Sequence, residues 1–257
     1  MAVHLQLIYN YEYRFMQLTK EDIFRFKQFE VRQDLCTMKV NSDGVLLGAW
    51  ADVKEADSIL DIGAGSGVVG LMLAQKRPTA TIVGVEIDNC SCEQAEVNFN
   101  NSPWKANLQI VESGVQDYGK NAGRKFDHIV SNPPFFSGGT LSDNQSKNVV
   151  RHTVKMSHGD LLLAIRRLLS DEGKCSIILP VIEGLRFIEI VERYSFYITR
   201  KTLMRPRAGK PLERILFEFS KKEHGEVKED ELVMYAGKEK EYTDDYKAIT
   251  KEYYLNL

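Results

Sequence analysis

A short Asn-Pro-Pro-Phe segment, residues 132–135, has residue types that could hold a planar nitrogen for chemistry. Pro133 and Pro134 fix the backbone and remove two N–H donors. The side-chain oxygen of Asn132 and the carbonyl of Pro133 can both accept from one NH₂ group, and Phe135 can stack on the ring that carries it. An amine oriented in this way is suited to in-line displacement of a methyl group. An ordinary Pro-Pro loop is the alternative, and adenine, guanine and a glutamine amide all stay open as acceptors.

A glycine-rich segment, residues 61–67, follows a short apolar run and precedes a helical pattern. Its glycines permit a tight turn and a close approach of a ligand to the backbone. Glu86 ends the next β-type run, about twenty residues further on, where a carboxylate accepts both hydroxyls of a ribose. The residues expected to bind this ligand are Asp61, Gly63, Ala64, Gly65, Gly67 and Glu86, and Asn132 is expected to contact it as well.

Two features of the glycine-rich segment distinguish between cofactors. Its Gly-x-Gly-x-Gly spacing differs from the Gly-x-Gly-x-x-Gly of dinucleotide sites. The adjacent Asp61 would repel a pyrophosphate, whereas it suits the ammonium group of an amino-acid cofactor. We therefore expect S-adenosylmethionine rather than NAD, and an enzyme rather than a binding protein without activity, since residues 132–135 are intact.

Alternating strand and helix patterns position these segments. They predict an α/β fold with a mostly parallel, Rossmann-like sheet of seven strands and an antiparallel strand at one edge. Both chemical segments then follow strands, at the carboxyl edge of the sheet where ligands bind. The expected strands are 58–62, 81–86, 108–111, 127–131, 175–179, 197–203 and 215–219, and the expected helices are 68–76, 91–100, 158–169 and 184–193.

The two ends of the chain are expected to pack on this core. We interpret residues 1–50 as an N-terminal extension with a strand or hairpin and a short helix capped by Asp43, and residues 51–257 as the methyltransferase domain. The highly charged residues 220–231 indicate a solvated loop. The Tyr-rich residues 246–255 indicate a closing helix.

The composition is that of a globular protein. Hydrophobic residues make up 43% and charged residues 27% of 257 residues, which fits one α/β domain and excludes disordered and collagen-like classes. A net charge of −2 argues against indiscriminate coating of nucleic acid. We expect no membrane span, no signal peptide and no metal site, and we expect a cytoplasmic protein with reduced thiols.

Residues 61–67, Glu86 and residues 132–135 together resemble the class I N6-adenine methyltransferases. Further stretches are similar to the branch of that family that modifies adenine 37, beside the anticodon of tRNA1(Val), and the resemblance runs from about residue 24 to the C-terminus. These stretches are Phe26–Phe29, Met38–Ala51, Leu73–Gln75, Asn101–Trp104 and the closing helix. The resemblance implies tRNA as the partner, with rRNA guanine-N2 or protein glutamine-N5 methylation as the alternative.

The resemblance also implies roles for individual residues. The three glycines would line the methionine moiety, Glu86 would hold the ribose, and Asn132 would hold the target N6 together with Pro133. Family members usually place an acid just after the third strand for the adenine of the cofactor. Gly114 stands at that position, so Asp117 is the expected substitute, with a backbone group or a water as the alternative.

An anticodon-loop base is single-stranded and can be brought into a pocket, while its phosphates need cations. Residues 199–214 hold six basic residues against one acid, and their centre, residues 206–211, is expected to form a mobile loop, with a merely solvated basic loop as the alternative. A second basic group follows residues 132–135. We expect no obligate protein partner. The residues expected to contact RNA are Lys39, Arg151, Lys155, Arg205, Arg207 and Lys210.

Overall fold

A computed structural model of the protein describes residues 19, 22–36, 38–134, 156–237, 239 and 241–257. In chain order the elements are β1 (Ile23–Arg25), β2 (Glu30–Arg32), α2 (Ser42–Trp50), β3 (Ser58–Ile62), α3 (Val68–Lys76), β4 (Thr81–Glu86), α4 (Asn89–Asn100), η2 (Lys105–Asn107), β5 (Leu108–Glu112), α5 (Val115–Asn121), β6 (Phe126–Ser131), α7 (His158–Leu168), β7 (Leu169–Pro180), α8 (Val181–Val191), η3 (Glu192–Tyr194), β8 (Tyr197–Arg207), β9 (Arg214–Ser220), β10 (Lys228–Tyr235) and α9 (Asp244–Thr250).

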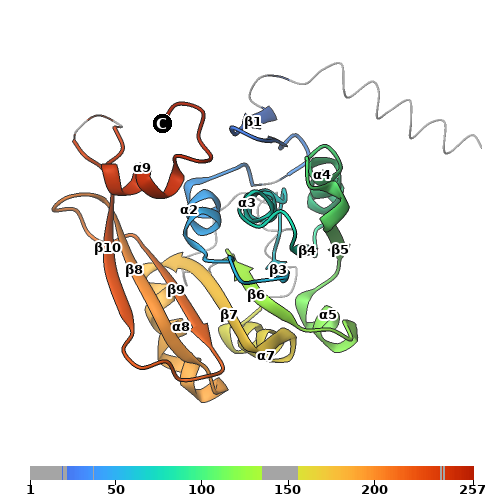
Figure 1. Cartoon of the computed structure of the whole chain (residues 1–257). Coiled ribbons are helices and arrows are strands. Elements are labelled where there is room, and N and C mark those ends of the chain that lie inside the picture. The colour runs from blue at the N-terminus through green and yellow to red at the C-terminus, as the bar shows by residue number, and fades with distance from the viewer. Residues whose placement is uncertain (1–18, 20–21, 37, 135–155, 238, 240) are drawn as a thin grey trace, which may run out of the picture.

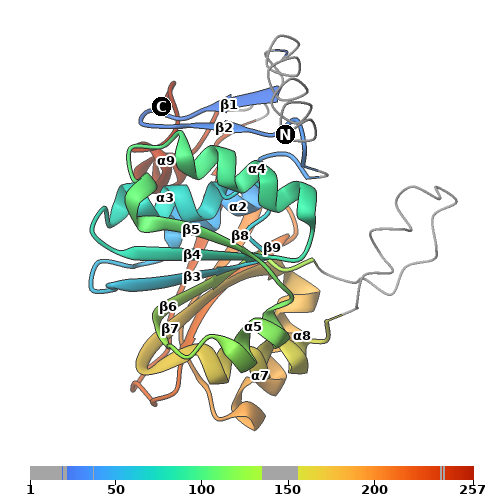
Figure 2. The ribbon, with the colours of Figure 1, turned by 90° about the vertical axis from the view of Figure 1, so that its right-hand side faces the viewer.

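The elements form three layers around one twisted sheet (Figure 1). Helices α2, α3 and α4 cover one face, and α5, α7 and α8 cover the other (Figure 2). Each face is sealed by its own group of buried hydrophobic side chains. The α/β fold expected from the alternating pattern is confirmed.

The main sheet has eight strands in the order β10-β8-β9-β7-β6-β3-β4-β5, one more than the seven predicted. Neighbouring strands are parallel except where β9 pairs with β7 and with β8. The predicted antiparallel pairing of the last two expected strands is thus confirmed as β8 with β9. The prediction that the antiparallel strand lies at the edge is wrong, because β10 extends the sheet beyond β8 and β7 pairs with the other side of β9.

Strand β10 also corrects the prediction of a solvated loop over residues 220–231. The connection between β9 and β10 spans only residues 221–227. From Lys228 onward the chain runs parallel to β8, and its later side chains Leu232 and Met234 are buried.

The charges of β10 meet opposite charges on β8. Lys201 Nζ lies 2.6 Å from Glu229 Oε2, and Arg205 NH2 lies 2.8 Å from Glu231 Oε2. Considered alone, the acidic segment predicts a solvent-exposed loop. It forms a strand because the basic strand β8 beside it supplies the opposite charges.

The predicted N-terminal hairpin is confirmed as β1 paired antiparallel with β2. The cap of α2 differs from the prediction: Asn41 Oδ1 accepts from Gly44 N at 3.0 Å, so Asn41 rather than Asp43 is the N-cap. Asn41 has the extended backbone that a cap requires, with φ −132° and ψ 167°. Asp43 instead pairs with Arg214 of β9, whose Nε lies 2.8 Å from its Oδ2.

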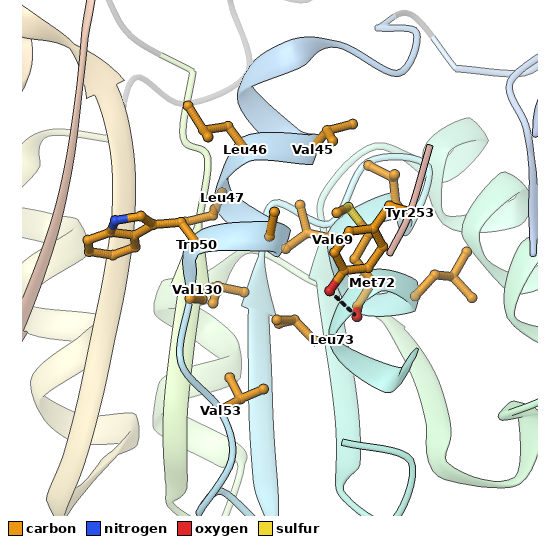
Figure 3. Packing of buried hydrophobic residues seen from close by; sticks show 14 of the residues in the cluster. Val45, Leu46, Leu47, Trp50, Val53, Val69, Met72, Leu73, Val130 and Tyr253 are labelled. Carbon is orange, nitrogen blue, oxygen red and sulfur yellow. Dashed lines mark hydrogen bonds between the residues drawn. The ribbon is translucent and has the colours of Figure 1, made fainter. Parts of the chain in front are cut away.

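Helix α2 packs against α3 in the core shown in Figure 3, where Val45 and Leu47 lie near Val69 and Met72. The carbonyl of Met72 accepts from the Tyr253 hydroxyl at 3.3 Å, which attaches the end of the chain to the same core. Helix α2 is therefore part of the central packing.

The sheet contains a buried histidine, His128 of β6, whose Nε2 lies 3.0 Å from Ser176 Oγ on β7. Burial lowers the pKa of His128 to about 4. The folded protein therefore keeps this imidazole neutral, whereas an unfolded chain protonates it below about pH 6.5. The stability that follows is full above pH 6.5 and is lost as the pH falls toward 4.

We predict that wild type loses about 2 kcal/mol more unfolding free energy between pH 7 and pH 5 than His128→Gln does, because the variant has no imidazole to protonate. Urea unfolding at the two pH values measures the difference, and the comparison cancels the other titrating groups, which both proteins share. Equal losses in the two proteins would contradict the neutral buried state of His128.

Candidate active site

The glycine-rich segment and the Asn-Pro-Pro segment come together where β3 and β6 end side by side. These strands are parallel, with Ile62 opposite Ser131, and Ser131 Oγ donates to the Ile62 carbonyl at 2.9 Å. Gly63 and Asn132 are the next residues, so they leave the sheet from neighbouring strands, whose usual spacing is about 5 Å. From β3 the chain continues toward β4 on one side, while β6 and β7 lie on the other. This reversal is the switch point at which open α/β sheets bind ligands.

The glycine-rich loop combines an open part with a closed part. Gly63, Gly65 and Gly67 have φ values of 72°, 55° and 80°, in the left-handed region. A Cβ added to Gly63 or Gly65 would meet no atom within 4 Å, whereas one on Gly67 would lie 2.6 Å from Phe99 Cε1. The first two glycines therefore leave room for a ligand against the backbone, and the third allows α4 to pack against the loop.

Glu86, at the end of β4, is oriented by backbone donors. Its Oε2 accepts from Gly65 N at 2.9 Å, and its Oε1 accepts from Ile87 N at 2.8 Å and Asp88 N at 3.0 Å. A carboxylate has about four acceptor positions. Three of these are occupied by backbone donors, so Glu86 can hold the loop and still accept from one hydroxyl of a ribose.

Asp61, one residue before the end of β3, is fully buried and its Oδ2 accepts from Gly70 N at 3.1 Å. Burial raises the pKa of Asp61 to about 7, the bond from Gly70 lowers it, and the charge of Glu86 raises it further. A positive group arriving near the loop would relieve the cost of ionising this carboxyl.

Of the predicted acceptor segment, Asn132 is half-buried, Pro133 is buried and Pro134 is exposed at the end of β6. Phe135 lies outside the described residues, and so do Arg151 and Lys155. The structure brings Asn132 and Pro133 beside the glycine-rich loop, as the sequence predicts.

The predicted adenine contact, Asp117, lies in the first turn of α5 and pairs with Lys120, with Nζ 2.8 Å from Oδ1 and its side chain 73% exposed. Sequence analysis missed a neighbouring apolar surface. Ile87 is 49% exposed, and its Cδ1 would lie 3.7 Å from a Cβ on Gly114. A flat purine could lie on this surface. The signal for it is the apolar residue directly after Glu86.

The basic segment 199–214 has a turn near its centre, as predicted, although β8 continues to Arg207 and so takes in the start of the expected loop. Its turn spans 208–213, so Lys210 lies in the turn while Arg205 and Arg207 lie on β8. Arg205 is paired with Glu231, as described above. Arg207 donates from Nε to the Gly237 carbonyl at 2.6 Å and lies 5.1 Å from the Tyr235 ring centroid.

The remaining predicted RNA contact, Lys39, lies near the start of α2 and is exposed, with its Nζ 3.9 Å from Asp22 Oδ1. Within the described part of the chain, no helix is long and apolar enough to cross a membrane, and no group of three or more His, Cys, Asp and Glu could hold a metal ion.

We predict that Gly67→Ala lowers the unfolding free energy by more than about 2 kcal/mol, because the methyl group overlaps Phe99 and the residue keeps a left-handed backbone. Gly65→Ala is the matched control in open space and should cost about 1 kcal/mol from the backbone alone. Thermal or urea unfolding measures both. Equal losses would show that Phe99 does not limit the space at Gly67.

Comparison with known proteins agrees with this geometry. A model of the family described as Methyltransferase small domain matches residues 38–197. A tRNA1(Val) (adenine(37)-N6)-methyltransferase from Histophilus somni (strain 2336) is 36% identical over 241 residues, 93% of this chain and 100% of that protein. One of the same name from Dyadobacter fermentans is 41% identical over 91% of this chain and 98% of its own length.

Among solved structures, a predicted O-methyltransferase from Agrobacterium tumefaciens shares the fold, with a TM-score of 0.66 and 20% identity over 84% of this chain and 100% of that chain. The residues of the site fit S-adenosylmethionine, which carries a ribose and an ammonium group. Gly63 and Gly65 leave the backbone open to a ligand, Glu86 suits the ribose, and the buried acid Asp61 suits the ammonium group. The predicted fold, methyltransferase activity and S-adenosylmethionine cofactor are confirmed. The chain belongs to the tRNA1(Val) (adenine(37)-N6)-methyltransferase family and contains its Methyltransferase small domain.

Proposed function

We propose that this chain transfers the methyl group of S-adenosylmethionine to N6 of adenine 37 in tRNA1(Val). Relatives that carry this name are 36% and 41% identical over more than nine-tenths of the chain. The observation that carries the proposal is that Gly63 and Asn132 follow neighbouring strands. The pairing of Ile62 with Ser131, and the hydrogen bond from Ser131 Oγ to the Ile62 carbonyl, hold these strands in register. A donor cradle and an amine acceptor site one strand apart are what direct methyl transfer to a planar amine requires.

On the donor side, the chain binds and orients the cofactor. Gly63, Ala64 and Gly65 leave the backbone accessible to the methionine part, and the remaining acceptor position of Glu86 takes a ribose hydroxyl. Asp61 supplies negative charge beneath the loop for the ammonium group. Ile87 offers an apolar surface for the adenine of the cofactor, and Asp117 stays the proposed contact for the amine of that adenine.

On the acceptor side, Asn132 Oδ1 and the Pro133 carbonyl each accept a hydrogen bond from one of the two N–H groups of the target amine. This directs the nitrogen lone pair at the methyl group, so that the N–C bond forms as the C–S bond breaks. Pro134 keeps this backbone rigid, and Phe135 stacks on the adenine. The proton that the product nitrogen sheds can pass to water.

For the phosphates of the anticodon loop, Lys39 and Lys210 are the better candidates among the described residues, because both are exposed. The guanidinium groups of Arg205 and Arg207 already bind within the chain. Arg151 and Lys155 keep their proposed contacts, which follow from the sequence. The four cysteines are free thiols, which supports a cytoplasmic protein.

The function is tested with labelled S-adenosylmethionine and unmodified tRNA pools, followed by nucleoside analysis of the product. Label in N6-methyladenosine at position 37 of tRNA1(Val) is the expected result. A transcript with guanosine at position 37 is the control and should stay unlabelled. Label in N2-methylguanosine of rRNA, or in a glutamine side chain of added protein, would overturn the acceptor while leaving the cofactor in place.

We predict that Asn132→Ala lowers kcat by about 100-fold or more and leaves donor affinity within about twofold of wild type, because the side chain orients the acceptor. Single-turnover kinetics and calorimetric titration of donor measure the two effects. Asn121→Ala, at the exposed end of α5, is the control and should change neither. Loss of donor binding in Asn132→Ala would show that the residue belongs to the cofactor site.

A further inference from the structure

A buried asparagine on α4 connects the N-terminal hairpin to the cofactor loop. Asn98 is 2% exposed. Its Nδ2 donates to the Arg32 carbonyl at 2.9 Å and to the Ser66 carbonyl at 2.8 Å, and its Oδ1 accepts from Arg32 N at 2.8 Å. One amide group therefore binds both backbone groups of a residue in β2 and one carbonyl of the glycine-rich loop.

The contact with Ser66 comes at a sensitive point of the loop. Ser66 stands between Gly65, whose N–H is held by Glu86, and Gly67, whose free side is filled by Phe99. Asn98 and Phe99 are consecutive on α4, so one bonds the loop while the other packs against it. A loop of three left-handed glycines has little intrinsic preference for one shape. These neighbours select the shape that leaves the cradle open.

A second buried amide on the same helix provides a natural comparison. Gln94 lies one turn before Asn98, is 1% exposed, and accepts from Leu35 N at 2.8 Å through Oε1. This bond reaches the segment after β2, not the glycine-rich loop. The two side chains are thus alike in burial, helix face and target segment, and differ in the bond to Ser66.

We propose that Asn98 is a positioning residue for the methyl donor, joining the β1–β2 hairpin and the Gly65–Gly67 turn into one unit. This rests on the proposed function, since it assigns the turn to the donor. Loss of the amide frees the Ser66 carbonyl from its donor, and the turn then samples shapes that do not accept the cofactor. Donor binding suffers, whereas transfer from bound donor depends on Asn132 and changes little.

The test compares Asn98→Leu with Gln94→Leu, each of similar shape and without hydrogen bonds. Calorimetric titration of S-adenosylmethionine, without RNA, should show a Kd about tenfold higher for Asn98→Leu and within about twofold of wild type for Gln94→Leu. The kcat at saturating donor should stay within about threefold for both. Because no RNA is present in the titration, a failure of adenine 37 as the acceptor would not alter this result.

Hydrogen exchange separates coupling from general loosening. Asn98→Asp keeps the acceptor for Arg32 N but loses both donated bonds, and should speed exchange over residues 63–67 as well as the hairpin. Gln94→Leu should speed exchange after β2 only. Three outcomes would each overturn the proposal, because Asn98 would then be structural. The Kd could change equally in the two leucine variants, or the Kd could stay unchanged in Asn98→Leu. In the third outcome, both Asn98 variants fail to fold while Gln94→Leu folds.

Discussion

The parallel pairing of β3 with β6 is the constraint on which the rest of the site depends. Side chains hold its register at both ends: Ser131 bonds the Ile62 carbonyl, and Asp127 Oδ2 accepts from Ser58 N at 3.0 Å and from Ser58 Oγ at 2.8 Å. A slip of one residue would reverse the faces of β6 and move Asn132 by about 3.3 Å along the strand. Both faces of this pair are buried, so the slip would also exchange the side chains packed in the two cores and disrupt the packing on both faces. Chemistry at the carboxyl edge is thus secured by packing along the whole strands.

Helix α2 shows how the N-terminal part of the chain contributes to that packing. Its last turn has no basic residue of its own, yet Lys76 Nζ donates to the Ala49 and Ala51 carbonyls at 2.6 and 2.7 Å. Arg200 donates to the Trp50 carbonyl at 2.9 Å and lies 3.5 Å above the Trp50 ring. Cations from α3 and β8 therefore satisfy the free carbonyls of α2. The helix thereby connects α3 to β8 on one face of the sheet.

The charged segments of β8 and β10 also depend on partners that are distant in the sequence. The basic stretch of β8 and the acidic stretch of β10 are each typical of solvated loops, but together they form a neutralised sheet edge. This matters for function, because guanidinium groups engaged in the edge are less available to phosphate than exposed lysines. The positive surface that an RNA meets is set by the charges left over after pairing, and the sequence does not reveal those.

Local backbone chemistry determined what the sequence predicted well. Three local features act through their own covalent structure: the glycines in a strand-to-helix turn, the acid at the end of the following strand, and the prolines after the asparagine that follows β6. The spacing of these residues in the sequence therefore indicates the cofactor and the acceptor. Tertiary structure decided which residues meet: the eighth strand, the cap at Asn41, the ion pair of Asp43 with Arg214, the surface at Ile87 and the bridge of Asn98 from Arg32 to Ser66. Each is a contact between segments far apart in the chain. Its energy depends on a partner that no local pattern specifies, and for this reason only the folded structure could show it.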